Sequence, residues 1–191
     1  MNTKKIEKGI ELVLEGLVGP DWQLDINYVE TPQRVARFYK ELFSRDGSEL
    51  TTFPDEFDQM IVLAHHLDWA LCPHHLLPVK LDISLAYIPN RHVLGLSKLA
   101  RLVRACLNKP ISQETLTDLI ADRLNDNVTV RESQMLSPNR PFGTAVLIYG
   151  EHACMQIRGV KTTAYTVTCT VRGAFREKPE VKEEFLALVR R

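Results

Sequence analysis

Apolar residues near the N-terminus recur at helical spacing, which predicts that the chain opens with an amphipathic helix. The residues with this spacing are Ile6, Ile10, Val13, Leu14 and Leu17. A loop rich in Gly, Pro and Asp follows. A second helix is then expected, with Thr31 as its N-cap and Pro32 at its first helical position.

Alternation of apolar and polar side chains predicts the strands. It is cleanest from Val79 to Tyr87, where every second residue is apolar, so a half-buried strand is expected. Three further segments are expected to be extended: 60–71, 144–149 and 165–171. Residues 46–58 are expected to form a loop.

Two helices are predicted between these strands, capped by Ser97 and Ser112 and separated by Pro110. The polar segment 125–141 is expected to form a loop or an irregular hairpin, and a helix is expected at the C-terminus. Helices, strands, two helices, strands and a last helix follow one another, which is an α+β pattern.

Composition narrows the class of protein. The chain has 191 residues, of which 45% are hydrophobic and 25% charged, so it can bury a sizeable core. The 24 basic and 24 acidic residues balance, which argues against general nucleic-acid or membrane-surface binding. Four sparse cysteines, a charged N-terminus and short apolar runs favour a cytoplasmic protein with reduced thiols.

Two short segments concentrate histidine and cysteine. Cys72, His75 and Cys154 offer three soft or borderline ligands, a set that suits zinc. Three protein ligands leave a position for water, whose pKa zinc lowers to about 7. His74 and His152 adjoin these ligands and could shuttle protons, but either could instead complete a structural zinc site.

The remaining histidines and cysteines have simpler interpretations. His65 and His66 are expected to be packed or surface residues, and His92 to be solvated in a turn. Cys106 and Cys169 fall on apolar faces and are expected in the core.

A second group of residues suits a phosphorylated ligand. Ser97, Lys98 and Arg101 stand at a helix start, and Arg158 follows Cys154 closely. A capped helix with a solvated basic face is the alternative. Gln113 and Glu114 could read the donor edge of guanine, or could simply be helix-start chemistry.

Together these segments resemble the GTP cyclohydrolase I family. The resemblance runs from about Thr31 to the end of the chain, so residues 1–30 are expected to form an N-terminal helix and loop and 31–191 the catalytic domain. The matching stretches are 31–36, 72–78, 86–89, 95–101, Gln113-Glu114, 152–154, 158–160, 172–175 and 184–186.

The resemblance implies a tunnelling fold (T-fold). Its α+β subunit has an antiparallel sheet with helices on one face and assembles into a toroidal homodecamer, with active sites at subunit interfaces. The implied reaction turns GTP and water into 7,8-dihydroneopterin triphosphate and formate. It begins with hydrolysis at C8 of guanine and is followed by ring opening, an Amadori rearrangement and ring closure.

The resemblance also implies roles for residues. Cys72, His75 and Cys154 are implied as zinc ligands, His152 as the principal proton-transfer group, and His74 as an assisting histidine. Ser97 is implied near the ribose and phosphates. The remaining implied contacts are Lys98, Arg101 and Arg158 for the triphosphate, Arg34 from a neighbouring subunit, and Gln113 and Glu114 for guanine and ribose.

Three features depart from the family pattern. Pro73 replaces the usual Glu, Thr115 replaces the Arg of many members, and segment 131–141 is longer than usual. Pro73 sustains the alternative of a non-catalytic or altered-rate zinc protein that binds nucleotide. A T-fold enzyme acting on another pterin or purine is a third hypothesis, which the retained histidines and the Gln113-Glu114 pair disfavour.

Overall fold

The structure, a computed structural model, describes residues 1–44, 50–127 and 142–190. It contains two compact units, Met1–Arg45 and Asp46–Arg191. The catalytic-domain boundary predicted at Thr31 stays a prediction. The predicted loop segment 128–141 lies outside the described residues, and within the described ranges no helix has the length and apolar character needed to cross a membrane.

The first unit is helical. Helix α1 (Thr3–Val18) is capped by Asn2, whose side chain accepts a hydrogen bond from the Lys5 backbone N–H at 3.0 Å. A 3-10 turn, η1 (Trp22–Leu24), leads to α2 (Thr31–Phe43). Both predicted helices are therefore present, but the N-cap of α2 is Glu30 rather than Thr31.

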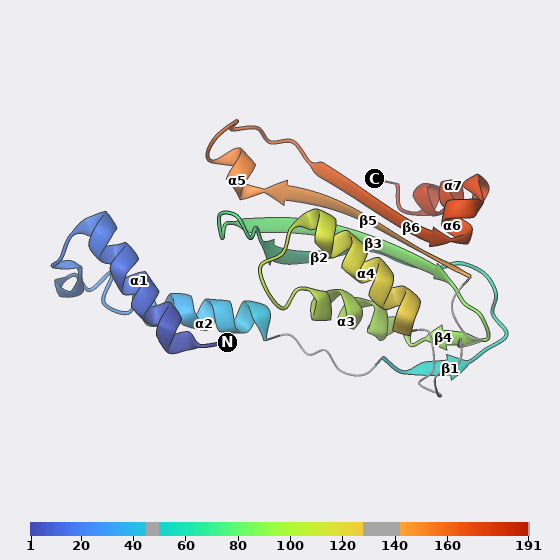
Figure 1. The fold of residues 1–191 in the computed structure, drawn as a ribbon, viewed down its shortest axis with the longest axis horizontal. Helices are drawn as coiled ribbons and strands as arrows, with labels where there is room; N and C mark the ends of the chain where they lie inside the picture. The colour runs from blue at the N-terminus through green and yellow to red at the C-terminus, as the bar shows by residue number, and fades with distance from the viewer. Residues whose placement is uncertain (45–49, 128–141, 191) are drawn as a thin grey trace. The chain divides into compact units, whose positions relative to one another are not determined.

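The second unit is built on a four-stranded antiparallel sheet with strand order β2-β3-β5-β6 (Figure 1). Its strands are β2 (Ile61–Leu71), β3 (Pro78–Ile88), β5 (Gly143–His152) and β6 (Thr166–Gly173). Each strand pairs antiparallel with its neighbour in this order. All four segments were predicted to be extended, and the α+β class is confirmed.

A small second sheet was not predicted. Strand β1 (Thr52–Pro54) pairs with β4 (His92–Leu94), so the predicted loop 46–58 contains a strand. His92 also lies in a strand instead of a solvated turn, and its Nδ1 is buried. Strands of three residues are too short to show a clear alternation of apolar and polar side chains. Their pairing is also long-range, so no local signal indicates it.

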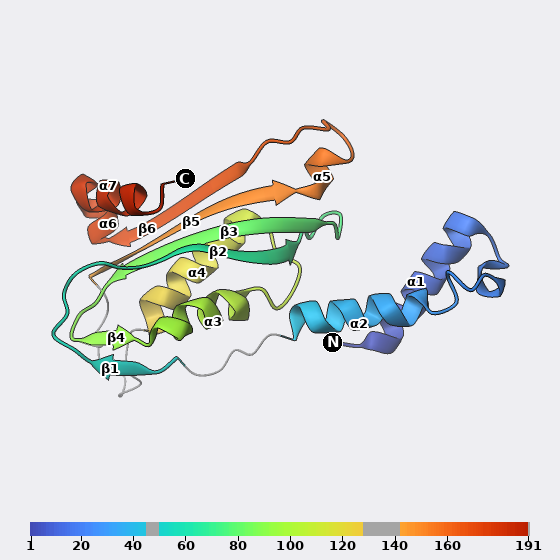
Figure 2. The ribbon, with the colours of Figure 1, turned by 180° about the vertical axis from the view of Figure 1, so that it is seen from behind.

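Helices cover both faces of the main sheet. Helices α3 (Leu96–Cys106) and α4 (Gln113–Asn127) pack against the odd-numbered side chains of β3, such as Leu81 and Leu85. The short α6 (Ala174–Glu177) and α7 (Pro179–Leu188) place Phe175 and Phe185 against the opposite face (Figure 2).

The second face of the sheet requires two corrections. Strand β3 is buried on both faces rather than half-buried, and Asp82, Ser84 and Ala86 are all enclosed. Cys106 is buried as expected, but Cys169 is exposed. Cys169 lies on β6, which is an edge strand of the sheet, and the layer formed by α6 and α7 packs against this strand at Val171.

The helix starts show one error and one confirmation. Helix α3 begins after Gly95, so Ser97 lies inside the helix and does not cap it. Ser112 does cap α4, because its hydroxyl oxygen accepts the Thr115 backbone N–H at 3.3 Å. The Ser112 hydroxyl in turn donates to Thr115 Oγ1 at 2.9 Å. Helix α4 continues through Asn127, into the start of the predicted loop.

Candidate active site

The predicted metal ligands meet at one end of the four-stranded sheet. Cys72 follows the last residue of β2, and Cys154 is the second residue of α5 (Ala153–Gln156), which directly follows β5. The register pairs Val79 with His152, which brings the start of β3 beside the end of β5. Between β2 and β3 the chain turns tightly, since the Cys72 N–H donates to Leu77 O at 2.9 Å.

The geometry of these ligands fits zinc. Cys72, His75 and Cys154 offer ligand atoms that all lie within 4.8 Å of one another. The Sγ of Cys72 is 3.7 Å from the Nδ1 of His75. A tetrahedral zinc ion places such a sulfur and nitrogen about 3.6 Å apart. Among the residues that the structure describes, this group has three members, which leaves one position for water.

The protonation of the two thiols also favours a site for a metal ion. Burial and the neighbouring Cys72 raise the pKa of the Cys154 thiol. Two adjacent thiols resist becoming two adjacent thiolates, and a divalent cation between them reverses that preference. These three residues therefore form a site that can hold zinc.

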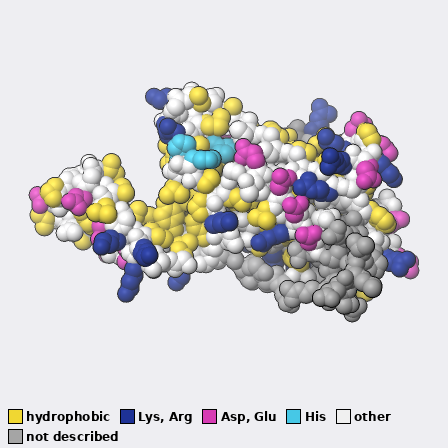
Figure 3. Space-filling model, viewed as in Figure 1, with side chains coloured by type: hydrophobic (Ala, Val, Ile, Leu, Met, Phe, Trp, Pro, Cys, Tyr) yellow, Lys and Arg dark blue, Asp and Glu magenta, His cyan; other side chains and the backbone are white. Residues whose placement is uncertain are grey.

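Two further predicted residues lie at the metal ligands. The Nδ1 of His74 is 3.7 Å from Cys72 Sγ, and its ring faces that of His75 edge-on with centroids 6.4 Å apart. The Nη1 of Arg158 lies 2.6 Å from His75 Nε2. Figure 3 shows histidine side chains gathered on the surface near the end of the sheet that carries α5.

His152 lies deeper and is held by the start of α4. Its Nε2 is 2.8 Å from the Oε1 of Gln113, which is 5% exposed. Burial lowers the pKa of His152, and the nearby Glu114 carboxylate opposes this shift. The Thr166 hydroxyl also donates to Gln113 Oε1, at 2.8 Å. Sequence reasoning missed this contact and Thr166; the alternating threonines of β6 were the available signal.

Two of the predicted phosphate-binding residues of α3, Ser97 and Lys98, are not brought to this end. Helix α3 starts beside β4, where the Leu94 N–H donates to the Tyr87 hydroxyl at 2.8 Å. Tyr87 and Val79 stand roughly 26 Å apart along β3, at about 3.3 Å per residue. Ser97 and Lys98 follow within this first turn of α3, so they and the metal ligands occupy opposite ends of the sheet (Figure 1).

Arg34 belongs to the first unit. It lies on α2 with an exposed side chain and donates to Glu30 Oε2 at 2.7 Å, in a surface ion pair one helical turn apart.

Comparisons with known proteins agree on one family. A family model described as GTP cyclohydrolase I matches residues 6–190. The GTP cyclohydrolase 1 of Hydrogenobaculum sp. is 37% identical over 193 residues, covering 100% of this chain and 99% of that protein. The GTP cyclohydrolase 1 of Aquifex aeolicus is 36% identical over 193 residues, covering 100% and 98%.

A solved structure, the archaeosine synthase QueF-Like in its apo form, also matches. It has a TM-score of 0.46 and 14% sequence identity, and the match covers 60% of this chain and 93% of that one. Similarity at this level supports no inference about function.

Proposed function

Because this chain belongs to the GTP cyclohydrolase I family, we propose that it converts GTP and water to 7,8-dihydroneopterin triphosphate and formate. The observation that carries the proposal is the Cys72, His75 and Cys154 group with His74 and His152 beside it. When bound, zinc supplies a Lewis acid that makes hydroxide available near neutral pH.

The side chains around the metal ligands move the protons in this proposal. Burial keeps His152 neutral at pH 7, so it can accept a proton as a general base and later return it. His74, exposed in the loop after Cys72, assists from the solvent side. His152 is more buried than His74, which suits the residue whose orientation must be fixed.

Of the two residues predicted to contact guanine and ribose, we assign the recognition of guanine to Glu114. Arg158 supplies a cation at the metal ligands, because it already reaches His75. Ser97, Lys98 and Arg101 are proposed for the triphosphate, and Arg34 is proposed to come from a neighbouring subunit. Because Ser97 and Lys98 lie at the opposite end of the sheet from the metal ligands, α3 of another subunit is proposed to supply these contacts.

We also propose that the chain assembles into a ring, a homodecamer, because the proposed site needs α3 from another subunit. Strands β2 and β6 are both edges of the main sheet. Apolar side chains on them are exposed, including Leu67 at 61% and Val167 at 52%. Exposed apolar edge strands are stabilised by pairing, and pairing β2 with β6 of the next copy would repeat into a closed ring.

The test is direct. Zinc-loaded protein is incubated with GTP, formate is quantified, and the product is oxidised to a fluorescent pterin. His152→Ala serves as the control, because it should keep zinc while losing turnover. Zinc-loaded wild-type protein that yields neither formate nor pterin would sink the proposal.

The second candidate, a zinc protein that binds GTP without converting it, rests on Pro73. This residue lies exposed in the loop that carries the ligands, where the family pattern has a carboxylate. Saturable GTP binding without formate release would favour this candidate. Pro73→Glu would then be expected to restore turnover.

A further inference from the structure

The side-chain amide of Gln113 is held by protein groups on both sides. Its Nε2 donates to the backbone carbonyls of Ile148 at 3.0 Å and Thr166 at 3.1 Å, and to Thr168 Oγ1 at 3.0 Å. The two carbonyls can only accept hydrogen bonds. The group that faces them must therefore be the NH₂ of the amide, which fixes the amide's orientation.

This orientation determines which atom of the Gln113 amide faces His152. The Oε1 of Gln113 accepts the Thr166 hydroxyl and lies 2.8 Å from His152 Nε2. An amide oxygen carries no hydrogen, so a hydrogen bond at this distance requires the proton on Nε2. In the neutral imidazole, Nδ1 is then the atom with the free lone pair.

Gly150 makes room for this contact. A Cβ on Gly150 would overlap Gln113 Oε1 and would come within 3.0 Å of His152 Nε2. The residue lies within β5. The requirement for glycine is one of space, because the Gln113–His152 contact passes directly over the strand at this position.

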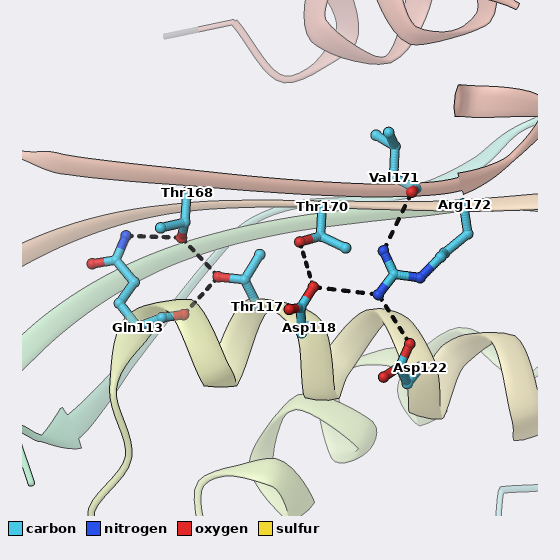
Figure 4. A network of polar contacts seen from close by, with 8 residues as sticks. All are labelled: Gln113, Thr117, Asp118, Asp122, Thr168, Thr170, Val171 and Arg172. Carbon is cyan, nitrogen blue, oxygen red and sulfur yellow. Dashed lines mark hydrogen bonds and ion pairs between the residues drawn. The ribbon is translucent and has the colours of Figure 1, made fainter. Parts of the chain in front are cut away.

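The start of α4 is itself clamped to β6, as Figure 4 shows. The Thr117 hydroxyl donates to the Gln113 carbonyl at 2.7 Å and lies 2.7 Å from Thr168 Oγ1. Thr168 Oγ1 also accepts from the Gln113 amide. Gln113 is thus fixed through both its backbone and its side chain, which makes it a rigid support for an imidazole.

We infer that Gln113 is a positioning residue, which holds His152 in one orientation and in the Nε2–H tautomer, so that the free lone pair is on Nδ1. The inference rests on the proposed function for the role of His152, but the tautomer itself does not. It differs from a guanine contact, because every donor and acceptor of the Gln113 amide is already engaged within the protein.

The tautomer is tested on the zinc-loaded full chain labelled with ¹⁵N-histidine. Two-bond ¹H–¹⁵N spectra at about pH 8.5, where an ordinary imidazole is neutral, distinguish the two tautomers. His152→Ala assigns the signal. We expect the Nε2–H pattern for His152, and an Nδ1–H pattern would overturn the inference. This result is independent of whether GTP is converted.

Kinetics separate positioning from substrate recognition. Gln113→Leu is expected to lower kcat about 10- to 100-fold, with KM for GTP within about threefold of wild type and zinc retained. A guanine contact predicts the reverse, a raised KM with kcat kept, and that outcome would overturn the inference. An unchanged kcat would do the same.

Gly150→Ala covers the case in which Gln113→Leu fails to fold, because it removes no polar group and its Cβ displaces Gln113 Oε1 from its contact with His152. It should lower kcat similarly and remove the single-tautomer pattern of His152. Gly16→Ala is the matched control, since a Cβ there meets nothing within 4 Å. A Gly150→Ala protein that keeps both kcat and the wild-type His152 spectrum would contradict the inference.

Discussion

The two ends of the main sheet differ in how completely one chain builds them. At the end with the metal ligands, Cys72, His75 and Cys154 converge within 4.8 Å, and Gln113 holds His152. At the other end, Ser97 and Lys98 lie in the first turn of α3, and no described metal ligand lies in that turn. The length of the sheet separates the metal ligands from the first turn of α3.

The difference suggests a division of labour. Proton transfer needs geometry fixed to a fraction of an ångström, and the metal end supplies it from side chains of a single subunit. Charge neutralisation of a flexible triphosphate tolerates groups brought by a neighbour, because Coulomb attraction falls slowly with distance. A site shared in this way would be complete only in the assembled protein.

The largest expected effect follows from removing a metal ligand. Cys154→Ala should release zinc and lower the rate of formate production by at least about 10³-fold, since several kcal/mol of transition-state stabilisation are lost. Metal content is measured alongside formate. Cys169→Ser is the matched control, because that cysteine is exposed and outside the ligand group. A Cys154→Ala protein that keeps zinc would refute the ligand assignment.

The next effect tests whether the two ends belong to different subunits. His152→Ala and Lys98→Ala should each be nearly inactive alone. When the two variants are co-expressed, a metal end with intact His152 can meet an intact α3 from its neighbour. Random mixing in a closed ring then restores about a quarter of the sites. Mixed assemblies without any activity would show that both residues must come from the same chain.

Much of the fold was predictable because its signals are local. The alternation over 79–87 became β3, and Ser112 caps α4 as its position indicates. The prediction that β3 is half-buried was wrong because distant segments contact its second face: the α6–α7 layer packs on Ala86, and His65 of β2 contacts Asp82 and Ser84. Sequence alternation reports the polarity of a face, and Asp82 and Ser84 are polar but enclosed.

The candidate site was predictable in its residue types and less so in its connections. Spacing and resemblance identified the three ligands, and the structure brings them together. The Gln113–His152 contact joins residues 39 apart in sequence and depends on the register of β5 and β6. No local pattern encodes such a contact. The role of Gly150 could not be predicted either, because a glycine inside a strand does not indicate which neighbouring side chain needs the space.

The pH dependence of activity is a smaller effect with a definite sign. Burial lowers the pKa of His152, so its neutral form persists below the ordinary value of 6.5, and kcat/KM should fall only as pH drops through this lowered pKa. Glu114→Gln removes the charge that raises this pKa, so the acid midpoint should move further down. A bound zinc ion acts in the same direction as burial. A midpoint that moves upward in Glu114→Gln would contradict the assignment.

The smallest expected effect compares two threonines on the same side of β6. Thr170 donates to Asp118 Oδ1 at 2.8 Å, and Arg172 Nη2 reaches the same oxygen at 3.3 Å (Figure 4). Thr170→Val should therefore cost at most about 1 kcal/mol of stability and leave kcat unchanged, because Arg172 still engages the carboxylate. Thr170 is also the main cause of the lowered pKa of Asp118.

A lowered carboxyl pKa stabilises the fold above the ordinary pKa and loses that effect as pH falls through the lowered value. The difference in melting temperature between wild type and Thr170→Val should accordingly shrink below about pH 4. Thr166→Val makes the same chemical change where the hydroxyl donates to Gln113 Oε1, and it should lower kcat. Equal losses of kcat in the two variants would mean that the whole contact between α4 and β6, rather than Gln113 alone, orients His152.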